Sequence, residues 1–174
     1  MMNKVYLGID IGGTAAEFGL VDENGNILHK DEFSVSFDGY ETPILKTVLE
    51  KTEYFVASSG LAFSEISGIG VSATGQIDSE KGEVIGSAGH IKNWVGSKIK
   101  ESFEKKYFVK TIVINDANSA ALGEKWIGAG RGYKNIVAIT IGTGVGGGII
   151  VDDKILLGKR GLAGEIGHIV IYGS

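Results

Sequence analysis

Residues 8–14, Gly-Ile-Asp-Ile-Gly-Gly-Thr, are the most informative part of the sequence, because an apolar strand pattern leads into Asp10 and then into a glycine loop. Residues 138–144, Ala-Ile-Thr-Ile-Gly-Thr-Gly, repeat the pattern. Further along each copy, Leu-Val-Asp at residues 20–22 is matched by Ile-Val-Asp at residues 150–152. All of these matches share one offset, so a unit of strand, glycine loop and strand occurs twice. Repetition on this scale predicts two related domains.

The rest of the chain alternates between strand and helix patterns, which predicts an α/β fold. Short apolar runs predict strands at residues 5–9, 17–21, 26–34, 66–72, 111–114, 135–141, 148–151 and 154–157, and a last one at 168–172. Apolar spacing of three to four predicts helices at residues 42–58, 94–107 and 116–128. We therefore expect a first domain over residues 1–116. A second begins over residues 117–174 and looks truncated, because no helices cover its last strand.

The composition is that of an ordinary globular protein, with 43% apolar and 22% charged residues among 174. Its net charge of −4 argues against a nucleic-acid partner, which needs a basic face. The absence of cysteine excludes disulfides and thiol chemistry. With no signal peptide and no run of about 18 apolar residues, we expect a cytoplasmic protein without a membrane partner.

Two glycine loops are candidates for binding phosphate. In the first, the amides of Gly12, Gly13 and Thr14 could bind anionic oxygens while Asp10 holds Mg²⁺ directly or through water. A plain hairpin turn explains this loop equally well. The second loop, residues 142–148, has five glycines, and a phosphate cradle explains this surplus better than a hairpin does. It is not a P-loop, because no Gly-Lys-Ser/Thr follows.

Asn115 and Asp116 stand where a predicted strand ends and an Ala-rich helix begins. Both residue types are good helix N-caps, and capping alone would account for them. The alternative is catalytic: Asp116 would accept a proton from a substrate hydroxyl as that hydroxyl attacks phosphorus.

A third group of polar residues is set among glycines. Glu165 and His168 are three residues apart, so one helical turn could present both to neighbouring hydroxyls of a sugar. The structural alternative is a solvated Glu and a capping or core His. Gly75 could allow close approach of a ligand or simply form a turn, and Trp94 is interpreted as a core residue rather than a sugar platform.

These motifs form one ordered set that resembles the ROK family of bacterial sugar kinases over essentially the whole chain. The set is Asp-Ile-Gly-Gly-Thr at 10–14, Gly-Val-Ser-Ala-Thr-Gly-Gln-Ile-Asp at 70–78, Asn-Asp-Ala-Asn-Ser-Ala-Ala-Leu-Gly-Glu at 115–124, Thr-Ile-Gly-Thr-Gly-Val-Gly-Gly-Gly at 140–148 and Ala-Gly-Glu-Ile-Gly-His at 163–168. The last three together are highly specific.

The resemblance implies an actin-like ATPase (RNase H-like) fold, with a complete first lobe and the beginning of a second lobe that closes with it on a sugar and ATP. It implies transfer of the ATP γ-phosphoryl group to a sugar hydroxyl, usually the 6-hydroxyl, with Asp116 as general base. Contacts to phosphate and Mg²⁺ are implied for Asp10, Gly12, Gly13, Thr14, Gly142, Thr143 and Gly144. Contacts to the sugar are implied for Gly75, Asn115, Asp116, Glu165 and His168.

The chain departs from the family pattern at several places. The family often has a basic residue shortly after Gly-Gly-Thr, where this chain has Ala15, Ala16 and Glu17, and it commonly has Asn where this chain has His90. Many members bind a structural zinc through the residue matching His168 and three later cysteines. Those cysteines are absent here, so no zinc is expected. The family typically runs to roughly 300 residues, which suggests an N-terminal portion here.

Other functions compatible with the resemblance are a ROK-type repressor and a non-catalytic sugar-sensing or partner-binding fragment. Against a repressor, the first strand begins at about residue 5, which leaves no room for a helix-turn-helix in front. A fragment could form a homodimer or pair with a missing C-terminal part. The sugar is left open between a hexose and an N-acylhexosamine, since glucokinases and N-acetylmannosamine kinases are resembled equally.

Overall fold

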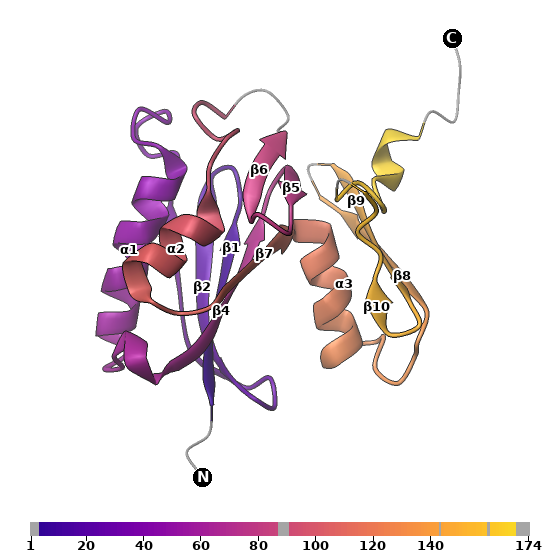
Figure 1. Ribbon diagram of the computed structural model, residues 1–174, viewed down its shortest axis with the longest axis horizontal. Coiled ribbons are helices and arrows are strands. Elements are labelled where there is room, and N and C mark those ends of the chain that lie inside the picture. The colour runs from indigo at the N-terminus through magenta and orange to yellow at the C-terminus, as the bar shows by residue number, and fades with distance from the viewer. Residues whose placement is uncertain (1–3, 87–90, 143, 160, 170–174) are drawn as a thin grey trace. The chain divides into compact units, whose positions relative to one another are not determined.

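The computed structural model describes residues 4–86, 91–142, 144–159 and 161–169 (Figure 1). The chain forms two compact units, Met1–Ile114 and Asn115–Ser174. Both contain strands and helices, as an α/β fold requires.

The first unit is built on a five-stranded sheet with the order β3-β2-β1-β4-β7. Its central strand β1 pairs antiparallel with β2 and parallel with β4, and β3 pairs antiparallel with β2. The five predicted strands are confirmed, with slightly different ends: β1 Val5–Ile11, β2 Ala15–Asp22, β3 Ile27–Ser34, β4 Ile66–Ala73 and β7 Thr111–Asn115.

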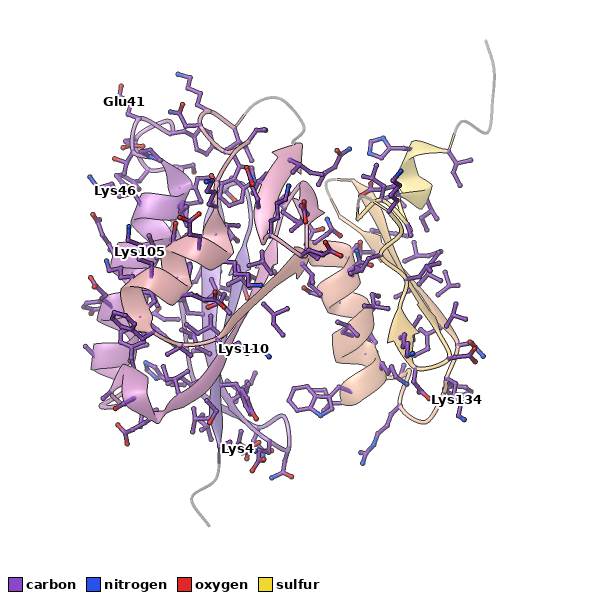
Figure 2. The ribbon with its side chains drawn as sticks, viewed as in Figure 1. Lys4, Glu41, Lys46, Lys105, Lys110 and Lys134 are labelled. Atoms are coloured by element: carbon purple, nitrogen blue, oxygen red, sulfur yellow. The ribbon has the colours of Figure 1, made fainter. Side chains whose placement is uncertain are left out.

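Two helices, α1 (Ile44–Ser58) and α2 (Ile99–Tyr107), cover one face of this sheet (Figure 1). Alternate residues of the strands point toward them and are buried, as the strand period of two requires. The core gathers Leu7, Ile9, Ile11, Phe18, Leu20, Val71 and Val113 from the sheet and Phe55 and Phe103 from the helices. Lys46 and Lys105 point outward from these helices (Figure 2), so the helix layer is amphipathic.

The predicted helix 94–107 is wrong in its first part, because α2 begins only at Ile99. Gly96 has a left-handed φ of 86°, which interrupts a helix at this point. The side chain of Trp94, which is 1% exposed, instead turns into the core, as expected for a core residue. Helix α1 begins directly after Pro43, two residues later than predicted, because proline is suited to the position before the first helical turn.

Two short strands of the first unit were missed by the sequence patterns. They are β5 (Gln76–Asp78) and β6 (Glu83–Gly86), which pair as an antiparallel hairpin. A 3₁₀ turn, Phe63–Glu65, leads into β4. These segments are too short to show a periodicity of their own.

In the second unit, α3 (Asp116–Trp126) packs on a sheet with the order β10-β9-β8. The strands are β8 (Ile136–Ile141), β9 (Val145–Val151) and β10 (Lys154–Ile155), as predicted apart from their ends. The strand predicted at 168–172 is wrong at its start, because Ile166–His168 forms a 3₁₀ turn. Residues 170–172 lie outside the described part of the chain. Among the described residues, no helix is long and apolar enough to span a membrane.

Candidate functional site

The first glycine loop closes the hairpin between β1 and β2. The amide of Gly12 donates to the carbonyl of Ala15 at 3.0 Å. A Cβ on Gly12 would lie 3.1 Å from that same carbonyl oxygen, so glycine suits this position best. The interpretation as a hairpin turn is therefore correct, and the turn leaves open what its remaining backbone groups bind.

Two carbonyl groups of this loop accept hydrogen bonds from residues outside the loop. The carbonyl of Gly13 accepts a hydrogen bond from the hydroxyl of Tyr40 at 2.8 Å, and that of Thr14 accepts one from the amide of Val35 at 2.9 Å. The amides of Gly13 and Thr14 donate to no group within the described residues. Because amides left available in a turn attract anions, the loop offers two donors to a phosphate group.

Asp10 lies near the end of β1, where its carboxylate is exposed and accepts a hydrogen bond from the Ser72 hydroxyl at 2.5 Å. The register places Glu17 opposite Asp10, and Glu32 opposite Glu17. No three His, Cys, Asp or Glu side chains within the described ranges are grouped to hold a metal ion. This donor set fits Mg²⁺ held mainly by phosphates and water, with one protein carboxylate, and not a closed protein cage.

The turn at Gly75 lies directly beside this loop. The amide of Thr74 donates to the carbonyl of Ile11 at 3.0 Å, which ties the end of β4 to the end of β1. The indole N–H of Trp94 donates to the carbonyl of Thr74 at 2.9 Å. Gly75 itself has a φ of 99°, so the turn requires a residue without a Cβ.

The glycines of the second loop fall into two groups. A Cβ on Gly146 would lie 2.9 Å from the Cβ of Ala117, and one on Gly148 would lie 2.5 Å from that of Ala121. A Cβ on Gly147 would lie 2.5 Å from the carbonyl oxygen of Gly164. All three glycines therefore serve close packing within the second unit.

Gly142 and Gly144 differ, because a Cβ on either one would meet no atom within 4 Å. The surplus of glycines therefore has a packing cause at 146–148, which the sequence pattern does not reveal. Packing within the described residues does not explain the two glycines at the tip. Thr143 lies outside the described residues.

Asn115 and Asp116 both accept hydrogen bonds from backbone amides at the start of α3. The side chain of Asn115 caps the helix by accepting from the amides of Ala117 at 2.9 Å and Asn118 at 3.4 Å. Asp116 is the first helical residue, and its exposed carboxylate accepts from the amide of Ala117 at 2.8 Å. Asn115 is therefore the N-cap, and Asp116 also accepts a first-turn amide while its carboxylate stays exposed.

Glu165 and His168 lie on one 3₁₀ turn. Their side chains approach to 3.7 Å between Nε2 of His168 and Oε2 of Glu165. The turn is held on β9 by two close approaches of glycine, Gly164 to Gly147 and Gly167 to the carbonyl of Val145. His168 is exposed, so it is not a core residue.

Comparison with known proteins identifies the family. The family model described as "ROK family" matches residues 6–173. A glucokinase of Halalkalibacterium halodurans is 37% identical over 173 residues, which cover 98% of this chain and 51% of the relative. A xylose repressor of Caldicellulosiruptor bescii is 29% identical over 165 residues, covering 95% of this chain and 41% of the repressor.

A solved structure of a ROK family glucokinase from Streptomyces griseus, in complex with glucose and AMPPNP, superposes with a TM-score of 0.82 at 32% identity. The similarity covers 97% of this chain and 51% of that one. The chain thus spans about half the length of the curated relatives it matches. The mixed sheet and these similarities confirm the expected actin-like ATPase fold. The chain belongs to the ROK family.

Proposed function

We propose that this chain carries the phosphate loops and sugar-binding residues of an ATP-dependent sugar kinase. The observation that carries the proposal is the exposed carboxylate of Asp116 at the start of α3, next to Asn115, which caps the helix. A positioned, exposed carboxylate is what a general base for phosphoryl transfer requires. Membership of a family that contains glucokinases supports the same conclusion.

In the proposed reaction, Asp116 accepts the proton of a sugar hydroxyl while the hydroxyl oxygen attacks the γ-phosphorus of ATP. The bond from the γ-phosphorus to the bridging oxygen breaks, and ADP leaves with that oxygen. The amides of Gly13 and Thr14 hold phosphate oxygens, with Gly12 shaping the turn. The tip of the second loop, Gly142 to Gly144, also holds phosphate oxygens through its backbone amides. Mg²⁺, when bound, would neutralise charge on the phosphates, with Asp10 holding it through water.

The proposed sugar ligands are the polar residues among glycines. Glu165 would accept a hydrogen bond from one sugar hydroxyl, and His168 would donate one to a neighbouring hydroxyl. Further contacts to the sugar would come from Asn115, Asp116 and the backbone at Gly75. We propose a hexose, with glucose first, since the 37% identical relative is a glucokinase and the Streptomyces griseus structure contains glucose. An N-acylhexosamine is the next class to test.

The test measures ADP production from Mg-ATP by this chain and by the complete reading frame of its gene. The sugars are glucose, mannose, fructose, N-acetylglucosamine and N-acetylmannosamine. Asp116→Asn should lower turnover by about 10²- to 10⁴-fold, with ATP affinity retained. Asp152→Asn changes another exposed carboxylate of the second unit and serves as the matched control. Equal activity of Asp116→Asn and wild type would remove Asp116 as the base.

A second candidate is sugar binding without phosphoryl transfer. Two observations favour it. The first is the similarity to a xylose repressor. The second is Glu17, which lies opposite Asp10 in the β1–β2 ladder, near where many family members have a basic residue. Like charges directly opposite each other on a sheet repel, and they would also repel a triphosphate. Sugar binding by calorimetry without any ADP production would support this candidate. Turnover restored by Glu17→Lys would then identify the cause.

A further inference from the structure

The carbonyl groups of the first glycine loop are held by side chains and amides that lie far from it in the sequence. Gly13 lacks a Cβ, so its peptide group can rotate at small steric cost. A rotated Gly13 carbonyl would direct negative partial charge toward an anion bound at the loop. Its observed orientation is fixed by the hydroxyl of Tyr40, which donates to it at 2.8 Å.

The backbone of the segment that carries Tyr40 has an uncommon conformation. Tyr40 has a φ of 66° and follows Gly39 at 68°, and aromatic residues rarely adopt this left-handed region. Strain of this kind persists where surrounding contacts enforce it, and it is often found beside functional sites.

Local hydrogen bonds enforce the conformation. The amide of Thr42 donates to Asp38 at 2.9 Å, and hydrogen bonds from Thr42 hold the pKa of the Asp38 carboxyl below its ordinary value. The amide of Gly39 donates to the carbonyl of Ser36 at 3.1 Å. The next side chain, Glu41, points outward (Figure 2), whereas the Tyr40 hydroxyl reaches Gly13.

We propose that Tyr40 is a positioning residue for the first loop. It keeps the Gly13 carbonyl away from the ligand side and so leaves the Thr14 amide, which belongs to the same peptide group, directed at a phosphate group beside the Gly13 amide. Tyr40 acts through the loop, and it donates its hydroxyl to backbone, not to the ligand. The role of Tyr40 in nucleotide binding rests on the function proposed above. Its role in the conformation of the loop is independent of that function.

A tyrosine that merely stabilises the fold is the alternative, and the chain offers a matched control for it. The hydroxyl of Tyr107 donates to the carbonyl of Leu49 at 2.6 Å within the same unit. Tyr107 lies on α2 and its bond joins two helices, so Tyr107→Phe removes a comparable aromatic hydroxyl without changing a loop contact.

The experiment compares Tyr40→Phe, Tyr107→Phe and wild type in two measurements, both on the protein encoded by the complete reading frame. The first is calorimetric binding of AMPPNP with Mg²⁺, and of glucose. The second is the amide ¹H–¹⁵N resonances of Gly13 and Thr14 without nucleotide. We expect Tyr40→Phe to weaken AMPPNP binding about fivefold, with glucose binding unchanged, and to shift or broaden both resonances. Tyr107→Phe should do neither.

Unchanged Gly13 and Thr14 resonances in Tyr40→Phe would overturn the proposal, as would equal weakening of AMPPNP binding by both tyrosine variants. If wild type binds no AMPPNP, the proposed kinase function fails. In that case the resonances alone decide whether Tyr40 sets the conformation of the loop.

Discussion

The two copies of the glycine-loop hairpin, β1–β2 and β8–β9, share a sequence pattern but differ in their surroundings. The last ladder pair before the loop is Ile11 with Ala16 in the first copy and Ile141 with Val145 in the second, so the second loop is one residue shorter. In the first copy Ile9 is 2% exposed, whereas the equivalent Ile139 is 59% exposed. The motif therefore lies in a closed core in the first copy and on an open apolar face in the second.

The loops themselves also differ. Tyr40, Val35 and other residues from outside the first hairpin hold the carbonyls of its loop. The tip glycines of the second loop, 142 and 144, face open space within the described residues. A shared motif thus indicates a shared backbone path, whereas the contacts made at each loop come from its neighbouring elements.

The largest expected effect is on the free energy of unfolding, because equivalent residues of the two hairpins differ in burial. Ile9→Ala should lower the free energy of unfolding by about 3 kcal/mol, because it leaves a cavity in the core. Ile139→Ala, at the equivalent position, should change it by about 0.5 kcal/mol or less, since the side chain is largely exposed. Urea denaturation of both variants checks this. A comparable loss at Ile139 would mean that the open face of β8 is covered in solution.

The next effect separates packing glycines from loop glycines within the second hairpin. Gly148→Ala should destabilise the protein by about 2 kcal/mol, because its Cβ would lie 2.5 Å from that of Ala121. Gly142→Ala should alter stability by about 0.5 kcal/mol at most, while it weakens AMPPNP binding. Thermal denaturation and calorimetry measure the two properties. Equal destabilisation by both variants would contradict the division of the glycines.

The smallest effect concerns the turn after the first hairpin. Asp22 accepts from the amides of Asn24 and Asn26 and from the Asn26 side chain, and these bonds lower the pKa of the Asp22 carboxyl. Its contribution to stability is therefore present above the unfolded-state pKa of about 3.9 and is lost as the pH falls through the lower folded-state value.

Asp22→Asn should consequently be less stable than wild type at pH 7, and the difference should shrink as the pH falls below about 4. Asn26→Ala removes the largest cause of the shift, so it should reduce the same pH dependence in part. Denaturation midpoints across pH 3 to 7 give the comparison. A gap between wild type and Asp22→Asn that stays constant over this range would exclude Asp22 as the source.

Local sequence patterns were sufficient to predict the strands of the five-stranded and three-stranded sheets, most of the helix positions, the repeated hairpin and the family. These properties reside in local periodicity and in residue order, which need no knowledge of distant contacts. The candidate loops and the pair at Asn115 and Asp116 were also found this way. The sequence could not decide between cap and base, because both tasks favour the same residue types at a helix start.

The contacts that those residues make could be assigned only from the tertiary structure. It showed that Asn115 caps α3, that glycines 146–148 serve packing while 142 and 144 do not, and that Trp94 leaves the helix pattern to enter the core. It also joined the Tyr40 hydroxyl to Gly13. Each of these outcomes depends on the distance between atoms that are remote in the chain or on a single backbone dihedral, and the spacing of residues along a sequence contains neither.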